Sequence, residues 1–111
     1  MAAKIHGRLG AVDLSATTDT EVYEVPAARK ATVCVNVCNR NATSITVRLA
    51  YVDAAAVGSV ANEDYIEYET TLAGYGVLER TGIPMTTGHI ILARASAANV
   101  SVMAYGLEED V

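Results

Sequence analysis

Apolar and polar residues alternate with a period of two along most of this chain. In residues 31–39, "ATVCVNVCN", three valines alternate with two cysteines and an asparagine, and in residues 44–52, "SITVRLAYV", every second residue is Ile, Val, Leu or Tyr. A period of two places successive side chains on opposite faces of a β-strand, and β-branched residues suit its pleated surface. Both segments are therefore predicted to be strands. The short polar stretch between them predicts that they pair as an antiparallel hairpin.

Weaker alternation marks six further segments: residues 4–14, 21–26, 65–72, 77–83, 89–96 and 99–109. We expect Val22 and Tyr23 on opposite faces of the second strand, and we expect Pro26 and Pro84 to end strands because proline has no N–H for a ladder. Short strands with a turn every 8–12 residues are typical of a sandwich or barrel. The predicted fold class is all-β, a single antiparallel β-sandwich of jelly-roll or immunoglobulin-like type with about 7–8 strands.

Length and composition indicate one core. The chain has 111 residues, 51% of them apolar, with no Phe or Trp and six Tyr. Small branched side chains on two facing layers suit a sheet sandwich better than a helical bundle. We expect residues 1–111 to form one domain, with residues 1–8 and 107–111 as extended arms. The Ala-rich segment 53–62 is predicted to be an inserted loop.

Charge and the length of apolar runs argue against two classes of partner, nucleic acids and membranes. The net charge is −5 and the pI is near 4.8. A surface that binds nucleic acid normally carries a basic stripe, and the eight Lys and Arg residues are scattered. No segment approaches the ~20 consecutive apolar residues that span a bilayer, and the N-terminus lacks the apolar region of a secretory signal. We expect neither nucleic acid nor membrane as a partner.

Cys34 and Cys38 are four residues apart, which suggests a metal site or a redox pair until the backbone is considered. On a strand that advances about 3.3 Å per residue they share one face but lie roughly 13 Å apart, whereas a disulfide needs Cα atoms within about 7 Å. If the neighbouring valines face the core, the cysteines lie on the opposite face, which favours cover by another chain and makes them candidates for an interchain disulfide. The reverse orientation would bury them as free thiols, and the pattern alone leaves this open.

No catalytic or metal-binding pattern emerges. HExxH, GxSxG, phosphate-loop and CxxC motifs are absent from the sequence. His6 and His89 could complete a zinc set with the two cysteines, but strand spacing separates the thiols. The acidic residues of 63–69 lack the aromatic platforms expected beside glycosidase carboxylates and the glycine of a calcium loop. We predict no enzyme activity, no catalytic residues, no cofactor and no metal site.

Tyrosines and the insertion supply the candidate contact residues. Tyr combines a large apolar area with a polar tip, which suits protein–protein contacts, although in a chain without Phe or Trp any one Tyr can equally be core filler. The predicted interface consists of Tyr65 and Tyr68 together with the insertion residues Ala54, Val57 and Val60.

Three stretches in order resemble small virion proteins of tailed bacteriophages. The first is residues 20–50, which contain Val-Tyr-Glu-Val-Pro-Ala near the start, followed by Cys-Asn-Arg and Val-Arg-Leu-Ala. The second is residues 64–83, with Tyr-Ile-Glu-Tyr and Val-Leu-Glu-Arg-Thr-Gly, and the third is residues 95–109. No single motif is diagnostic, and the specificity lies in their order. The chain departs from the group at Ala28, where a glycine is often found, and in the Ala-rich insertion.

The resemblance implies a non-enzymatic structural protein of the virion, first of all a capsid decoration or cement subunit. A neck, collar or tail accessory protein is the nearest variant, and a receptor- or carbohydrate-binding module of a fibre is the alternative of another class. The implied partners are further copies of the chain, for example in a trimer, and other virion proteins such as the major capsid protein. The implied location is the virion, assembled in the cytoplasm of a host bacterium.

Overall fold

The computed structural model describes residues 4–53 and 60–111. These residues form eight β-strands and one short 3-10 turn, η1 (Asn62–Asp64). The strands are β1 (Lys4–Leu14), β2 (Thr20–Glu24), β3 (Arg29–Asn39), β4 (Ile45–Val52), β5 (Tyr65–Leu72), β6 (Val77–Thr86), β7 (Ile90–Ala95) and β8 (Val100–Asp110). Nowhere in this part of the chain is a helix long and apolar enough to cross a membrane.

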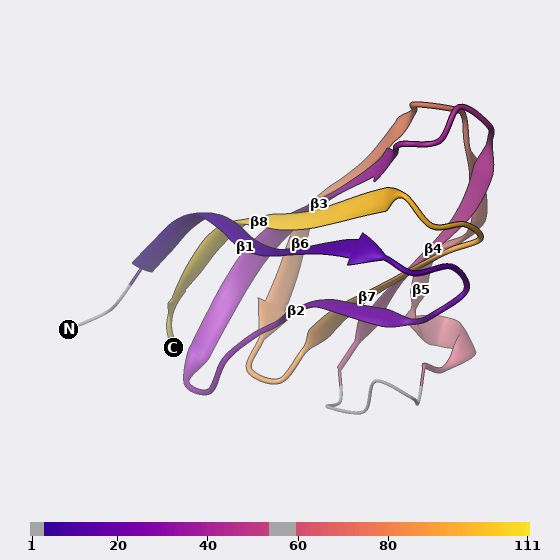
Figure 1. Ribbon diagram of the computed structural model, residues 1–111. Coiled ribbons are helices and arrows are strands. Elements are labelled where there is room, and N and C mark those ends of the chain that lie inside the picture. Colours follow the sequence, from indigo (N-terminus) through magenta and orange to yellow (C-terminus); the bar gives the residue numbers. More distant parts are fainter. Residues whose placement is uncertain (1–3, 54–59) are drawn as a thin grey trace.

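The strands form two antiparallel four-stranded sheets that lie face to face (Figure 1). One sheet has the order β1-β8-β3-β6 and the other β2-β7-β4-β5, so consecutive strands mostly belong to different sheets or are not neighbours. This interleaved order is that of an eight-stranded jelly roll and differs from the immunoglobulin arrangement. The predicted all-β sandwich is confirmed, and of the two types it is the jelly roll.

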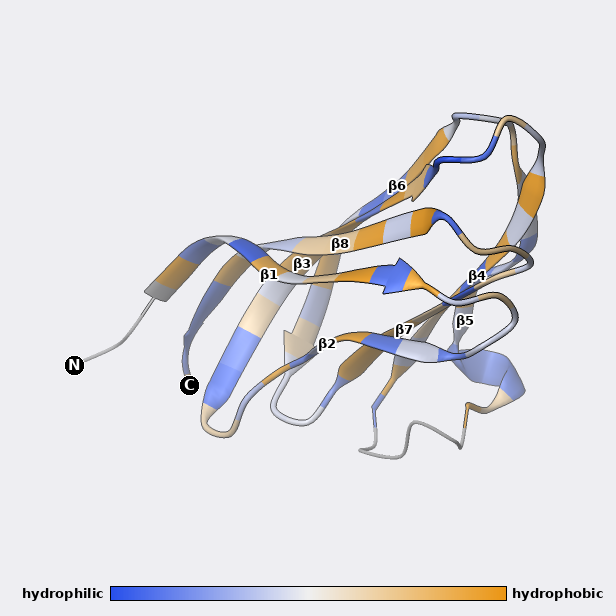
Figure 2. Cartoon of the chain, in the orientation of Figure 1, coloured by the Kyte–Doolittle hydropathy of each residue, from blue (hydrophilic) through white to orange (hydrophobic). Residues whose placement is uncertain are grey.

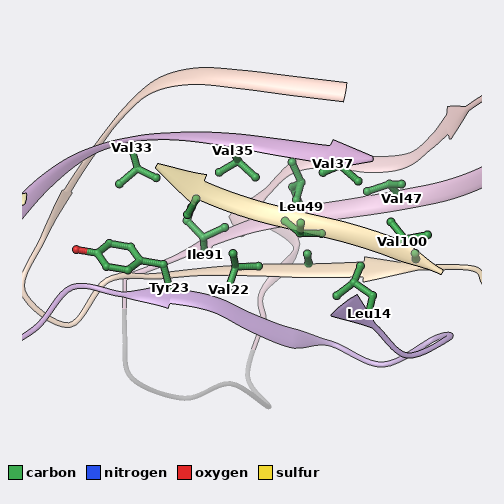
Figure 3. Close-up of a cluster of buried hydrophobic side chains, with 14 of the residues drawn as sticks. Leu14, Val22, Tyr23, Val33, Val35, Val37, Val47, Leu49, Ile91 and Val100 are labelled. Atoms are coloured by element: carbon green, nitrogen blue, oxygen red, sulfur yellow. The ribbon is translucent and has the colours of Figure 1, made fainter. Parts of the chain in front are cut away.

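The core lies between the sheets and is made of small branched side chains. Val33, Val35 and Val37 of β3 are fully buried and point toward residues of the opposite sheet such as Leu49 and Ile91 (Figure 3). Figure 2 shows the hydrophobic residues concentrated along strands such as β7 and β8. Of the two orientations that the alternation in β3 left open, the structure has the valines facing the core, and Cys34 and Cys38 lie on the other face, each half-buried.

The predicted hairpin between residues 31–39 and 44–52 is wrong. β3 pairs with β6 and β8, whereas β4 pairs with β5 and β7 in the other sheet. Both strands present their branched residues to the same core from opposite sides, so the connection between them crosses from sheet to sheet. Alternation identifies the buried face of a strand, but it does not identify the hydrogen-bonding neighbour.

Two local expectations also fail, each for a backbone reason. Val22 and Tyr23 are both buried in the core, because the β2–β7 register shifts between Glu21 and Tyr23 and so turns two adjacent side chains inward. Strand β6 continues through Pro84 to Thr86. Proline is tolerated there because β6 is the outer strand of its sheet and pairs only with β3.

One buried amide joins two loops at one end of the sandwich. Asn39 is completely buried, and its Nδ2 lies 3.0 Å from the carbonyl of Thr43, 3.2 Å from that of Leu72 and 3.0 Å from that of Ala73. Its Oδ1 accepts hydrogen bonds from the backbone N–H and the side-chain amide of Asn41. The Asn39 side chain, together with the backbone hydrogen bond from Tyr75 N–H to the carbonyl of Asn41, therefore ties the β3–β4 connection to the β5–β6 connection.

At the opposite end, β1 and β8 form one curved ribbon in which Lys4 pairs with Glu109 (Figure 1). Gly7 and Gly106 face each other in this ladder with φ of 117° and 146°, values that side chains rarely adopt. A Cβ on Gly106 would lie 2.2 Å from the carbonyl oxygen of Thr32 in β3. Residues 4–8 and 107–110 are thus strand residues in this chain, and their use as arms in an assembly stays a prediction.

Candidate interaction surface

The outer face of the β2-β7-β4-β5 sheet carries a second apolar cluster, separate from the core. Strand β7 is apolar on both faces, so Ile91 points into the sandwich while Ile90 and Leu92 point outward. Ala50 and Val52 of β4 join these two outward residues, and all four are at least 97% buried. Val60 and Tyr65, on either side of η1, pack against the cluster. The chain itself therefore covers part of this face.

Beside this cluster, two tyrosine rings pack edge to face. The rings of Tyr65 and Tyr68 are 4.9 Å apart between centroids and meet at 76°. Tyr65 is partly buried against the apolar cluster, whereas Tyr68 is 58% exposed. A shallow depression is lined by these two rings and Asn62. An aromatic side chain that is fixed on one side and open on the other can bind a partner at little cost in conformational entropy.

Two arginines lie next to the two tyrosines. The Arg48 guanidinium lies 4.5 Å from the centroid of the Tyr68 ring, a cation–π contact. Arg48 of β4 pairs directly with Arg94 of β7 in the strand register. Arg48 Nε is 3.0 Å from Glu69 Oε2, and Arg94 is 3.8 Å from Asp19. The hydrogen bond and charge of Arg48 lower the pKa of the Glu69 carboxyl and Glu69 in turn raises the pKa of Arg48, so both groups stay ionised.

We call Tyr65, Tyr68, Arg48, Glu69 and Arg94 the tyrosine–arginine strip. Its residues come from three neighbouring strands, β5, β4 and β7, of a single sheet. Tyr and Arg are the residue types that most often dominate binding energy at protein interfaces, because each combines a large contact area with directed polar groups. The strip is the candidate functional site.

The other outer face, on the β1-β8-β3-β6 sheet, carries the cysteines. In the ladder Cys34 lies opposite Tyr105 and Cys38 opposite Ser101, and both thiols are free. Tyr105 Oη donates a hydrogen bond to Glu79, which, with partial desolvation, raises the pKa of Tyr105 to about 12. Neither cysteine approaches the other within bonding distance on an extended strand, so a disulfide would have to join separate chains, and this stays a prediction.

A buried ionic group ties the C-terminal strand to the rest of the molecule. Glu108 is 4% exposed, accepts a hydrogen bond of 2.5 Å from Tyr23 Oη, and lies 2.8 Å from Arg29. Burial, with the hydrogen bond to Glu108, raises the pKa of Tyr23 far above its usual range. This group could not be predicted from the sequence, because its members are separated by up to 85 positions.

The remaining polar candidates lie apart. Tyr51 Oη donates a hydrogen bond to the carbonyl of Pro84 and lies 2.6 Å from His89 Nδ1, so this histidine has a structural role at the end of β6. His6 lies in β1, on the other sheet. Across residues 4–53 and 60–111, no group of three or more His, Cys, Asp and Glu is arranged to hold a metal ion.

The structure brings together part of the predicted interface. Tyr65 and Tyr68 are in contact, and Val60 packs beside Tyr65, whereas Ala54 and Val57 lie outside the described residues. The two arginines of the strip were missed. Arg48 stands at an outward position of a predicted strand, which is a usable signal, but its meeting with Arg94 depends on a strand pairing that alternation does not reveal.

Comparison with known proteins finds similarity in fold only. No family model and no curated protein matches the sequence. The coat protein of tobacco streak virus superposes with a TM-score of 0.54 at 10% identity, covering 99% of this chain and 86% of that one. A chain of infectious bursal disease virus, Gx strain, gives 0.50 at 10% identity over 98% of this chain and 32% of its own. A chain of the T13 particle of the same virus superposes with a TM-score of 0.51 at 7% identity, covering 98% of this chain and 30% of that one.

This chain therefore spans about a third of the two bursal disease virus chains and is matched by most of the tobacco streak virus coat protein. Identities of 7–10% show a shared fold and no more. The sandwich is of the kind from which these viral particle proteins are built.

Proposed function

We propose that this chain is a non-enzymatic structural protein of a virion. The observation that carries the proposal is the jelly-roll fold, which superposes on a viral coat protein over 99% of this chain and 86% of that one. Jelly rolls also occur in lectins and other proteins, so the fold alone does not decide. The acidic composition, with a net charge of −5, suits a subunit that contacts protein rather than packaged nucleic acid.

Within the virion, we place the chain as a capsid decoration subunit of a tailed bacteriophage. The ordered resemblance over residues 20–50, 64–83 and 95–109 supports this choice. The subunit binds further copies of itself, as in a trimer, and the major capsid protein, and it joins the particle in the cytoplasm of the bacterial host. A contact of modest strength, repeated over a symmetric lattice, gives high avidity without an active site.

The tyrosine–arginine strip is the surface through which the subunit contacts its neighbours. Tyr68 is its most exposed aromatic residue and is fixed by Tyr65 on one side and by Arg48 on the other. Truncation of such an anchored residue in an interface typically costs about 2 kcal/mol or more, a loss of about 30-fold in affinity.

A second candidate function rests on the contact between Tyr65 and Tyr68. Two tyrosine rings and the amide of Asn62 around a depression could bind a sugar ring, with an aromatic face for its C–H groups and an amide for its hydroxyls. In that case the chain is a carbohydrate- or receptor-binding module of a fibre, and its ligand lies on the host cell surface.

The test uses capsids of the virus that encodes the chain, purified without this protein. We expect saturable, stoichiometric binding and a higher temperature of capsid disruption. Tyr68→Ala should weaken binding at least tenfold, while Tyr75→Ala, which alters a 71% exposed tyrosine in the β5–β6 connection, should leave it unchanged. Binding to host cells or their glycans with no effect on capsids would favour the fibre module, and binding only to tails would move the subunit to the neck or tail.

A further inference from the structure

Two arginines lie directly opposite each other on adjacent strands, although the chain has only eight Lys and Arg residues. Cross-strand neighbours have Cβ atoms about 4.5–5.5 Å apart, and like charges in such a pair destabilise the sheet. Arg48 and Arg94 are moreover only partly exposed, with 24% and 34% of their side chains accessible. The position therefore needs an anion to balance it.

The chain's own carboxylates, Glu69 and Asp19, balance the two charges but engage only some of the N–H donors of the two arginines. Glu69 meets Arg48 at one nitrogen, Nε, at 3.0 Å, and Asp19 stands 3.8 Å from Arg94, beyond hydrogen-bond distance. A guanidinium has five N–H donors arranged as a planar fork. Tyr65 also hydrogen-bonds with Arg48, and these contacts together still leave N–H donors of the two forks without a carboxylate among the described residues.

Both arginines line a small hollow on this face of the sheet. Its walls include both arginines, Glu69 and the hydroxyl-bearing residues Thr17, Thr46 and Ser96, and its volume is about 70 Å³. A water needs roughly 10–15 Å³ measured in the same way, so there is room for about five heavy atoms. That is the size of a side-chain carboxylate with the carbon that carries it.

The geometry points to a binding site for the carboxylate of an aspartate or glutamate from an adjoining protein subunit. A planar carboxylate matches the arginine fork through two parallel hydrogen bonds. A doubly charged phosphate fits less well, because Glu69 lines the same small hollow and repels the additional charge. The site deepens the proposed function, since it rests on the strip being a contact surface and gives the chemistry of what that surface binds.

Position supports this assignment. Arg48 lines the hollow and also contacts the tyrosine pair, because its guanidinium stacks on Tyr68. A partner segment that places an apolar side chain against the tyrosines can reach the hollow with an acidic residue a few positions further on. Exposed carboxylates are abundant on this acidic chain, which has 13 Asp and Glu, so a neighbouring copy is able to supply one.

The first experiment tests the hollow in the isolated protein. Arginine Nε–H signals are followed by NMR during separate titrations with acetate, inorganic phosphate and chloride at constant ionic strength. We expect the Arg48 and Arg94 signals to shift together with acetate, while Arg40, which pairs with Asp13, stays unchanged as the internal control. Glu69→Gln should tighten acetate binding several-fold, and Arg94→Lys, which keeps the charge but loses the fork, should weaken it by a similar factor.

Equal shifts of all arginines, no shift at all, or binding of phosphate without acetate would each overturn the carboxylate assignment. The second experiment separates the site from the function by measuring capsid binding of Arg94→Lys. If the unaltered chain binds capsids and Arg94→Lys binds equally well, the site is wrong and the function stands. If acetate binds in the hollow but the chain ignores capsids, the site stands and the proposed function is wrong.

Discussion

Replacing the buried amide of Asn39 tests whether one side chain holds the two loops at its end of the sandwich. Its amide nitrogen contacts three carbonyl groups and its oxygen accepts two hydrogen bonds from Asn41. In Asn39→Ala all of these contacts are lost, and because the amide has only two N–H hydrogens they amount to about four hydrogen bonds, each worth about 0.5–1.5 kcal/mol net. Water can partly replace those that are only part-buried. We therefore expect the free energy of unfolding to fall by about 3 kcal/mol, a large part of the 5–15 kcal/mol typical of a domain.

The measurement is equilibrium unfolding in urea, with Asn36→Ala as the matched control. Asn36 lies three residues earlier in β3 but on the outer face and half-exposed, so its replacement should cost less than about 0.5 kcal/mol. Hydrogen exchange should also accelerate at the backbone N–H of Tyr75, which donates to the carbonyl of Asn41. A loss below about 1 kcal/mol for Asn39→Ala, or one equal to that of the control, would refute the reasoning.

The isosteric change Asn39→Asp sharpens the test. It places carboxylate oxygens against the carbonyls of Thr43, Leu72 and Ala73 in a buried site, so the introduced carboxyl should have a raised pKa in the folded protein. A raised pKa means that the variant is least penalised below about pH 4, where the unfolded carboxyl is also protonated, and loses stability as pH rises. The opposite trend, with stability gained between pH 4 and 7, would contradict the assignment of these oxygen contacts.

Three further predictions concern other parts of the molecule. Because burial and a carboxylate raise the pKa of Tyr23, its stabilising contribution is complete below about pH 10 and is lost as pH rises, by up to about 1.4 kcal/mol per pH unit; Tyr23→Phe should reduce this alkaline slope in unfolding measurements. Gly106→Ala should destabilise the chain more than Gly7→Ala, because both positions have positive φ but only the first would place a Cβ 2.2 Å from a backbone carbonyl. Non-reducing gels of intact particles should show oligomers that disappear in Cys34→Ser or Cys38→Ser, and a single monomer band would exclude interchain disulfides.

The strands could be predicted from the sequence because each buries one face, and burial leaves a period of two. The predicted segment 65–72 coincides with β5, and most other segments agree with the structure within one to three residues. Strand neighbours could not be predicted, because every core-facing strand carries the same pattern whichever sheet it joins. Residues 31–39 and 44–52 looked like a hairpin for this reason, and the buried Asn39 that fixes the sheet-crossing connection looked like an ordinary turn residue.

The candidate site, too, could be predicted from the sequence only in part. Composition drew attention to Tyr65 and Tyr68, but residues three positions apart on a regular strand lie on opposite faces. Their rings meet because the β4–β5 register shifts between Leu49 and Ala50, which the sequence does not reveal. Arg48 and Arg94 are brought together by the β4–β7 register, and Thr17 reaches the same hollow from the β1–β2 connection. Such a meeting is a property of the topology, and a single sequence carries no local trace of it. Ala28 has a φ of 61°, in the left-handed region that glycine adopts more readily than alanine.

The strand order also has a consequence for how the chain is made. β8 lies between β1 and β3, and β7 lies between β2 and β4, so each of the two strands synthesised last occupies an interior place in its sheet. While a ribosome is still producing them, β1 and β2 have no strand to pair with in their own sheets, and their apolar faces are exposed to the cell. The sandwich can close only after synthesis of β8, so folding is expected to be slow, as is usual where pairing joins distant segments. A chain that stops before β8 would be a target for chaperones and proteases rather than a shorter functional subunit.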